Sequence, residues 1–383
     1  SKPEEIDEID RKILQLEMEK LSLGRESDAA SQERLEKLER ELAELSEQQS
    51  TLNAQWQQEK GAIDELSNLK EEIERVQLQV DQAKRSYDLN KAAELEYGTL
   101  ATLQKQLAEK EAAREDKVDF VSIVVQNHLH FEVAKTFLEA GFNVICDKPM
   151  TRTLEEARAL RDIVDETGKV FCLTHNYTGY PMVKEARRMV QDGELGRLLK
   201  VVAEYPQGYA VGDVEGDGQG QISNWRADPA IAGASNCMGD IGTHAHNLVR
   251  YICGVEVDEL AAELSAFIPG RELDDDGNCL VRFTDGVKGI IYASQISNGD
   301  ENNLNIRAYG TKASIEWHQE DPNELIVKDA RAPRQIYRRG NSYIGGAAAA
   351  NTRIPFGPPE GFIEAFANVY NAAAMAIHDE VAG

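Results

Sequence analysis

The spacing of apolar residues along the chain changes character near residue 117. Before that point, apolar residues recur at alternating intervals of three and four, in one run over 35–56 and another over 63–83. This spacing places a single apolar stripe on each helix, and the stripe must be buried against a partner helix. Gly24 and Gly98 interrupt the pattern and mark expected turns. The first part of the chain is therefore predicted to be a helical coiled coil folded back on itself.

After residue 117 the apolar residues are arranged differently. The segment 119–125 is mostly apolar and β-branched, as in a parallel strand that is buried on both faces. Two similar short runs follow, at 143–146 and 170–174, each after a helical pattern that ends at a glycine. This alternation of strand and helix is typical of a doubly wound sheet. From about residue 197 onward, period-two runs joined by turn signals indicate an antiparallel sheet.

Together these patterns predict a fold class and a division into domains. We expect an α/β protein with an N-terminal α-helical coiled coil, a partial Rossmann-type parallel sheet, and an α+β domain whose open sheet is mainly antiparallel. The expected boundaries are 1–115 for the coiled coil, 116–178 for a truncated nucleotide-binding domain and 179–383 for a substrate-binding domain.

Charge and cysteine content narrow the class of protein. The formal net charge of −25 repels nucleic acid and anionic membrane, so neither is an expected partner. No uncharged apolar run reaches the roughly 18 residues that a membrane span needs, and no signal peptide is recognisable. The five cysteines show no paired spacing and lie in or beside apolar runs. We interpret them as reduced core thiols of a cytoplasmic protein, not as disulfides or metal ligands.

The first candidate for chemistry is Lys148, which follows a predicted buried strand and precedes Pro149. Ligands of doubly wound sheets bind at the carboxyl ends of the strands. A lysine at that place can supply a cation or an acid to a substrate oxygen. Exposed lysines in turns are common, however, and spacing alone favours that second interpretation.

The second candidate is the pair Asp240 and His244. They are four residues apart, so they share a face if the segment is helical. A histidine beside a carboxylate is a standard arrangement for taking a proton from an alcohol. The alternative is that Asp240 caps a helix and His244 only packs. His244 and His246 have a spacing that suits a metal weakly, and no third ligand is evident, so we expect no metal site.

The first part of the chain resembles a known coiled coil. The segments SKPEEIDEIDRKILQLEMEKLSL, RLEKLERELAEL, AQWQQEK and AAELEYGTLATLQKQL closely resemble the middle domain of ClpB-type disaggregases. In that family the coiled coil is inserted into an AAA+ ATPase and binds a DnaK-type chaperone, so the resemblance implies a chaperone partner. The chain has no GxxxxGKS or GxxxxGKT phosphate loop, so ATPase activity is not implied.

The rest of the chain resembles a different family. The segments IVVQNHLHFEVAKTFLEAGFNVICDKPMTRTLEEA, HNYTGYPMVKEARRMV and NWRADPAIAGASNCMGDIGTHAHNLVRYICG are similar to the glucose–fructose oxidoreductase/inositol dehydrogenase (Gfo/Idh/MocA) family. The resemblance implies NAD or NADP as the cofactor and the hydroxyl of a sugar or polyol as the substrate. It also implies a homo-oligomer formed through the open face of the antiparallel sheet.

The same resemblance implies roles for individual residues. Lys148 and Asp240 would orient the reacting hydroxyl, and His244 would take its proton. The implied cofactor contacts are Asn127, His130, Asp147 and Lys148, with Asp147 standing where the family usually has Glu. The implied substrate contacts are Tyr177, Trp225 and Arg226.

The chain departs from that family before residue 118. The first strand, the GxGxxG turn and the acidic residue that reads the adenine ribose should lie there, and the coiled coil lies there instead. The GDGQGQ segment at 216–221 follows no predicted strand and lacks the third glycine. Because the pyrophosphate site is missing, we expect an impaired oxidoreductase. Two alternatives stay open: a coiled-coil, chaperone-associated interaction protein, and a non-natural chimera of two truncated genes without activity.

Overall fold

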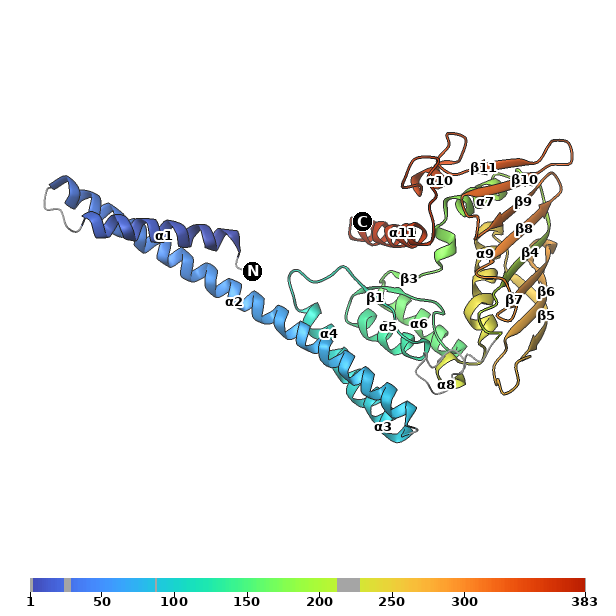
Figure 1. Ribbon diagram of the computed structural model, residues 1–383, viewed down its shortest axis with the longest axis horizontal. Coiled ribbons are helices and arrows are strands. Elements are labelled where there is room, and N and C mark those ends of the chain that lie inside the picture. The colour runs from blue at the N-terminus through green and yellow to red at the C-terminus, as the bar shows by residue number, and fades with distance from the viewer. Residues whose placement is uncertain (1–2, 24–28, 87, 212–227, 383) are drawn as a thin grey trace. The chain divides into compact units, whose positions relative to one another are not determined.

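The chain forms two compact units, one up to Arg114 and one from Glu115 onward. The computed structural model describes residues 3–23, 29–86, 88–211 and 228–382, and Figure 1 traces them by element. The two units are described separately below.

The described regular structure of the first unit consists of helices. Its elements are α1 (Glu4–Leu23), α2 (Ala29–Arg85), α3 (Leu89–Ala93), the π-helical turn η1 (Glu94–Leu100) and α4 (Ala101–Ala112). α1 packs against one half of α2, and α3, η1 and α4 pack against the other half.

The apolar stripe of α2 is buried where the spacing predicts it. Leu38 and Leu45 form a small core with Leu16 of α1. Polar pairs along the same seam fix its direction: Lys20 bonds to Glu39 at 2.9 Å, and Gln49 donates to Asp10 at 2.7 Å. Since the later residue of one helix meets the earlier residue of the other, the two helices run antiparallel. The interlocked packing of a coiled coil stays a prediction.

The turn predicted at Gly98 is wrong, and Gly24 lies outside the described residues. Gly98 sits inside η1, where the helix continues as a π-turn. The reversal comes earlier, before α3, where the Asp88 carboxylate accepts from the Lys91 backbone N–H and caps the new helix. A glycine inside a helix costs only about 1 kcal/mol, which packing against α2 outweighs.

The second unit begins with a small parallel sheet. Its strands are β1 (Phe120–Ile123), β2 (Asn143–Cys146) and β3 (Phe171–Leu173), paired in the order β1-β2-β3. α5 (His130–Glu139) and α6 (Leu154–Thr167) make the two crossovers. The predicted strand and helix alternation is therefore confirmed. α6 has clear local causes, because Thr153 and Glu156 form a capping box and Gly168 ends the helix in the left-handed conformation.

An eight-stranded sheet follows, in the order β11-β10-β9-β8-β4-β7-β6-β5. All its neighbouring strands are antiparallel except β4 and β7. The strands are β4 (Leu198–Pro206), β5 (Val257–Ser265), β6 (Asp276–Phe283), β7 (Lys288–Ser294), β8 (Asn305–Gly310), β9 (Ser314–His318), β10 (Glu324–Lys328) and β11 (Gln335–Arg338).

Helices cover one face of this sheet. They include α7 (Pro181–Gln191), which packs against β9 and β10, and α9 (Thr243–Cys253), which packs against β4, β7 and β8, as Figure 1 shows. Together they bury the main core. Buried and exposed side chains alternate along β6, so the opposite face of that strand meets solvent. Leu280 of β6 is exposed on this side of the sheet. The prediction of an open, mainly antiparallel sheet is confirmed.

The remaining helical segments lie between or after the strands of the two sheets. They are η2 (Asn127–Leu129), η3 (Asn176–Gly179), α8 (Pro229–Ala232), the π-turn η5 (Met238–Gly242), η6 (Thr284–Gly286), α10 (Gly346–Ala350) and α11 (Phe362–Ala382). Tyr370 of α11 shares a 2.6 Å hydrogen bond with Ser122 of β1, and Asn368 donates to the carbonyl of Gly179 at 2.9 Å. α11 therefore ties the small sheet to η3.

Two further observations concern the whole described chain. None of its helices combines the length and the apolar character that crossing a bilayer requires. All five cysteines are free thiols, and four of them are buried. Burial raises the pKa of Cys146 to about 12, as it does for Cys253, so these thiols are unreactive core residues.

Candidate functional site

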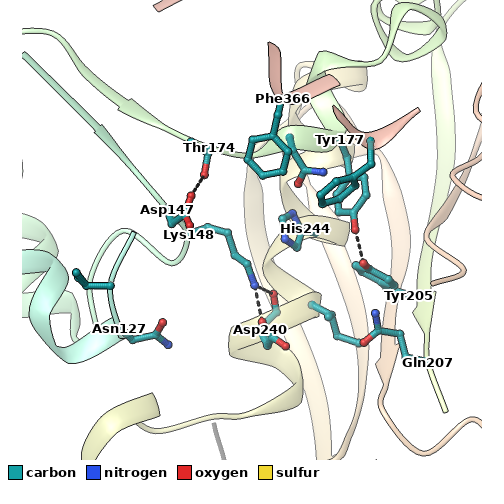
Figure 2. A pocket seen from close by; sticks show the side chains of 14 residues that line it. Asn127, Asp147, Lys148, Thr174, Tyr177, Tyr205, Gln207, Asp240, His244 and Phe366 are labelled. Carbon is teal, nitrogen blue, oxygen red and sulfur yellow. Dashed lines mark hydrogen bonds and ion pairs between the residues drawn. The ribbon is translucent and has the colours of Figure 1, made fainter. Parts of the chain in front are cut away.

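A cavity of about 280 Å³ lies where the carboxyl ends of β1, β2 and β3 face η5, α9 and β4. Figure 2 shows the side chains that line it. They are Val125, Asn127, Asp147, Lys148, Thr174, Asn176, Tyr177, Tyr205, Gln207, Asp240, Ile241, His244, Phe362 and Phe366. The cavity thus lies at the sheet edge where strand topology places ligand sites.

Lys148 reaches across the cavity from the end of β2 to η5. Its Nζ donates to the Asp240 carboxylate Oδ1 at 2.5 Å and to the Asp240 carbonyl at 2.7 Å (Figure 2). Both side chains are about four-fifths buried. Lys148 is therefore a fixed cation inside the cavity and not an exposed lysine in a turn. Its third ammonium hydrogen is not used by Asp240.

His244 lies one helical turn after Asp240, at the start of α9, and only 6% of it is exposed. Its ring meets the rings of Tyr177 and His175 edge-on, with centroids 4.7 and 5.5 Å away. Burial, followed by the charge of Lys148 and the nearby His175, holds the pKa of His244 well below its usual value. The imidazole is therefore neutral at pH 7. In the described part of the chain, neither of its nitrogens forms a hydrogen bond.

A ring of polar side chains forms the wall beside His244. The Tyr177 and Tyr205 hydroxyls are 2.5 Å apart, and Tyr205 donates to Asn302 Oδ1 at 2.6 Å. Asn302 Nδ2 donates to the Tyr177 hydroxyl oxygen at 3.2 Å, which closes the ring of hydrogen bonds. Gln207 donates to the same Asn302 oxygen at 2.8 Å. Since Gln207 uses its N–H there, its carbonyl oxygen stays available as an acceptor at the cavity wall.

The opposite wall consists of residues that follow the parallel strands. The Asp147 carboxylate accepts from the Thr174 hydroxyl at 2.7 Å, which links the ends of β2 and β3. Asn127 follows β1 and lines the same wall. His130 is placed differently: its two ring nitrogens lie 2.6 Å from the Pro149 carbonyl and 3.1 Å from the Val125 carbonyl. It joins two loops behind the cavity and is not among the lining residues.

Two family comparisons cover most of the chain. Residues 44–175 match "Oxidoreductase family, NAD-binding Rossmann fold", and residues 183–316 match "GFO/IDH/MocA C-terminal domain". The uncharacterized oxidoreductase YfiI of Bacillus subtilis is 35% identical over 270 residues, which are 70% of this chain and 68% of that protein. The chain belongs to the Gfo/Idh/MocA oxidoreductase family. The first match begins within α2, but the described strands of the Rossmann sheet begin only at Phe120.

Similar solved structures agree with this assignment. An inositol dehydrogenase homolog from Azotobacter vinelandii complexed with NAD⁺ has a TM-score of 0.69 and 36% identity, over 72% of this chain and 70% of that one. Levoglucosan dehydrogenase in complex with NADH and levoglucosan has a TM-score of 0.61 and 29% identity, over 68% and 72%.

The helical unit has a different set of relatives. Chaperone protein ClpB 1 of Parasynechococcus marenigrum is 84% identical over 117 residues. The match covers 30% of this chain and only 14% of that protein. The predicted resemblance of the N-terminal segment to ClpB is thereby confirmed.

The Gfo/Idh/MocA assignment implies a nicotinamide dinucleotide, and the cavity fits one end of it. Asn176 is almost completely buried in the cavity wall, and its Nδ2 has no hydrogen-bond partner among the described residues. An unsatisfied buried donor at a cavity indicates a polar ligand. The pyrophosphate end is not matched, because α4 precedes β1 where a dinucleotide-binding unit has a strand, a glycine-rich turn and a helix.

The cavity collects most of the residues singled out from the sequence. Asn127, Asp147, Lys148, Asp240, His244 and Tyr177 all line it. Trp225 and Arg226 lie outside the described residues. In the described part of the chain, no group of three His, Cys, Asp or Glu side chains could hold a metal ion.

Several lining residues escaped the sequence reasoning. They are Thr174, Asn176, Tyr205, Gln207, Phe362 and Phe366. Tyr205 and Gln207 stand at the end of β4, after a run whose alternation indicates only a half-buried strand. Thr174 and Asn176 carried a usable signal, because they follow β3 just as Lys148 follows β2.

Proposed function

We propose that the second unit is an NAD- or NADP-dependent oxidoreductase that acts on the hydroxyl of an uncharged sugar or polyol, and that this chain alone binds the dinucleotide weakly. The observation that carries the proposal is the Lys148–Asp240 pair beside a neutral, buried His244 in one cavity. Relatives support the substrate class, since solved family members hold myo-inositol with NADH and levoglucosan with NADH.

His244 is proposed as the general base. A base must be unprotonated before it can take a proton, and burial keeps this imidazole neutral at pH 7. Its nitrogens are not engaged by other groups in the described chain, so one lone pair can accept the hydroxyl proton. The edge-on contacts with Tyr177 and His175 hold the ring in one orientation.

Lys148 is proposed to bind the same hydroxyl oxygen. As the proton moves to His244, negative charge develops on that oxygen, and the fixed, largely buried ammonium stabilises it. Asp240 keeps the ammonium in place through two of its hydrogens and leaves the third for the substrate. When bound, the nicotinamide would accept a hydride from the carbon that bears this hydroxyl. Asn127, Asp147, Lys148 and Thr174 stand where they could hold the nicotinamide end.

The proposed substrate is uncharged because the cavity offers little to an anion. Its described charged residues are Asp147, Lys148 and Asp240, and the one cation is already paired. The Gln207 oxygen and the tyrosine ring instead suit hydroxyl groups. Tyr177, together with Trp225 and Arg226, is proposed to contact the substrate.

Cofactor binding tests this function directly. The purified chain is titrated with NADH and NADPH while the fluorescence of the reduced nicotinamide is followed. We expect weak saturable binding, in the millimolar range because the pyrophosphate site is missing, and loss of that binding in Lys148→Ala. No binding at any accessible concentration would contradict the enzyme proposal for this chain. Exposed Lys312→Ala serves as the control for loss of a lysine.

A second candidate function concerns the helical unit. Its 84% identity to a ClpB segment favours a partner-binding role, and we propose a DnaK-type chaperone as that partner. Residues 1–114 contain no histidine or cysteine, which also favours binding over catalysis. Surface plasmon resonance with the chain immobilised and a DnaK-type chaperone in solution measures this directly. Absence of binding at tens of micromolar chaperone would leave the helices with a structural role only.

A further inference from the structure

A buried amide lies directly behind the Lys148–Asp240 pair. We propose that Gln295 is a positioning residue that fixes the Asp240 carboxylate and, through it, aims the Lys148 ammonium into the cavity. Gln295 follows β7 and is completely buried. Its Nε2 donates to Asp240 Oδ2 at 3.1 Å, on the side of the carboxylate opposite to Lys148. The role of Gln295 in the reaction rests on the proposed function, whereas its hydrogen bonds to Asp240 and Asn236 do not depend on it.

The orientation of the Gln295 amide is determined by Asp240, whose ionised carboxylate can only accept, and its second partner agrees with it. Gln295 Oε1 accepts from Asn236 Nδ2 at 2.9 Å. A reversed amide would place its oxygen against the Asp240 carboxylate and its NH₂ against the NH₂ of Asn236, so both contacts would be repulsive. Gln295 can therefore face Asp240 only with an N–H, which is the group that stabilises an ionised carboxylate.

Asn236 is itself held by a buried carboxylate. Asp274 accepts from the backbone N–H of Asn236 through Oδ1 at 2.9 Å and from that of Met238 through Oδ2 at 2.8 Å. The backbone N–H of Gln295 donates to the Asp275 carbonyl at 2.9 Å. The segment between β5 and β6 thus holds the backbones of Asn236 and Gln295 in place. Gln295 in turn holds Asp240 of η5, the partner of Lys148.

The consequence is a division of the two Asp240 oxygens. Oδ2 accepts from Gln295 and Oδ1 accepts from Lys148, whose Nζ also donates to the Asp240 carbonyl. Among the described residues, Tyr177, Tyr205 and Cys237 are further titratable groups near this carboxylate, and burial raises the pKa of each, so they are neutral at pH 7. Gln295 is therefore the neutral donor that fixes the Asp240 carboxylate, and this carboxylate in turn fixes the direction of the Lys148 ammonium.

The decisive variant is Gln295→Glu, which keeps the shape and changes only the donor. At pH 8 two carboxylates would face each other, and we expect a melting temperature clearly below that of the parent chain. At pH 5 the pair would share a proton, and a protonated Glu can donate to Asp240 as Gln295 does. We therefore expect the gap in melting temperature to shrink by at least half. Gln335→Glu, an exposed change of the same kind on β11, should show no such narrowing.

A second variant separates positioning from packing. Gln295→Met fills the space without a donor, and the ammonium signal of Lys148 is followed by nitrogen-15 NMR, identified by its absence in Lys148→Arg. We expect hydrogen exchange at this ammonium to become about tenfold faster, as for one weakened hydrogen bond. An unchanged exchange rate, or a Gln295→Glu gap equal at both pH values, would overturn the proposal. Both measurements use the chain without cofactor, so a failure of NADH binding does not affect them.

Discussion

The two units of the chain bury their apolar residues in different ways. The helical unit buries about one residue in every one or two helical turns, such as Leu38 and Val80. These residues form a stripe that can be recognised from their spacing in the sequence. The second unit buries Val201, Leu248 and Trp317 from distant parts of the chain in one core. Every histidine and cysteine of the sequence lies in that second unit. A local pattern is enough to build a rod, but a reactive site needs side chains brought together over long sequence distances.

The largest effect that separates the two units is expected at His244. If the second unit carries the chemistry, His244→Ala removes the proposed base, and turnover of a polyol at saturating cofactor should fall by about 10²–10⁴-fold. Initial rates of NADH formation measure this. Exposed His378→Gln, on α11, should leave the rate within twofold. An unchanged rate in His244→Ala would remove the histidine from the reaction.

Core substitutions should destabilise only the unit in which they lie. Trp317 is buried against Tyr180, and its Nε1 donates to the Pro322 carbonyl. Trp317→Ala should lower the free energy of unfolding of the second unit by about 3–5 kcal/mol, and Leu38→Ala should lower that of the helical unit by about 2–5 kcal/mol.

Urea unfolding followed by far-ultraviolet and near-ultraviolet circular dichroism distinguishes the two transitions. Leu280→Ala, exposed on β6, is the matched control and should change stability by less than about 0.5 kcal/mol. A single transition shifted equally by Trp317→Ala and Leu38→Ala would show that the units unfold together.

Most of the fold could be predicted from the sequence because its signals are local. The three strands of the small sheet appear as short apolar runs, and the capping box at Thr153 marks the start of α6. The conformation at Gly98 could not be predicted, because it depends on contacts that are not local. The propensity of one glycine is weak, and packing of η1 against α2 outweighs it there.

The site was only partly predictable. Lys148 and the Asp240–His244 pair stand beside recognisable signals, a strand end and a helix start. Gln295 carries no signal, since it follows an ordinary strand and acquires its place only when β7 lies beside η5. Spacing could also not choose between an exposed and a buried Lys148. The cavity decides it by pairing this lysine with a residue 92 positions away.

Acid should lower the free energy of unfolding of the second unit by less than the largest core substitutions and by more than the loss of a helix cap. Burial, followed by the charges of Lys148 and His246, lowers the pKa of His175 to about 4. The unfolded chain binds a proton near pH 6.5 and the folded chain does not, so stability is complete above about pH 6.5 and falls as the pH drops toward 4. The loss attributable to His175 is about 3 kcal/mol.

Chemical denaturation at pH 7 and pH 4.5 tests this, with His175→Leu as the variant. That variant should lose part of the pH dependence, whereas His378→Gln, which alters an exposed histidine, should keep all of it. The helical unit, which has no histidine, should show no matching change over this range. An identical pH dependence in His175→Leu and in the parent chain would contradict the buried neutral state.

The smallest expected effects compare helix caps in the two units. Thr153 accepts from the Glu156 N–H at 3.2 Å, and Asp88 accepts from the Lys91 N–H at 3.2 Å. Alanine at either position should cost about 1 kcal/mol, each in its own unit. The cost should be larger at Thr153, because Glu156 completes a reciprocal box there. Equal shifts of both unfolding transitions in either variant would mean that the two units unfold cooperatively, and would contradict the view that each unit has its own core.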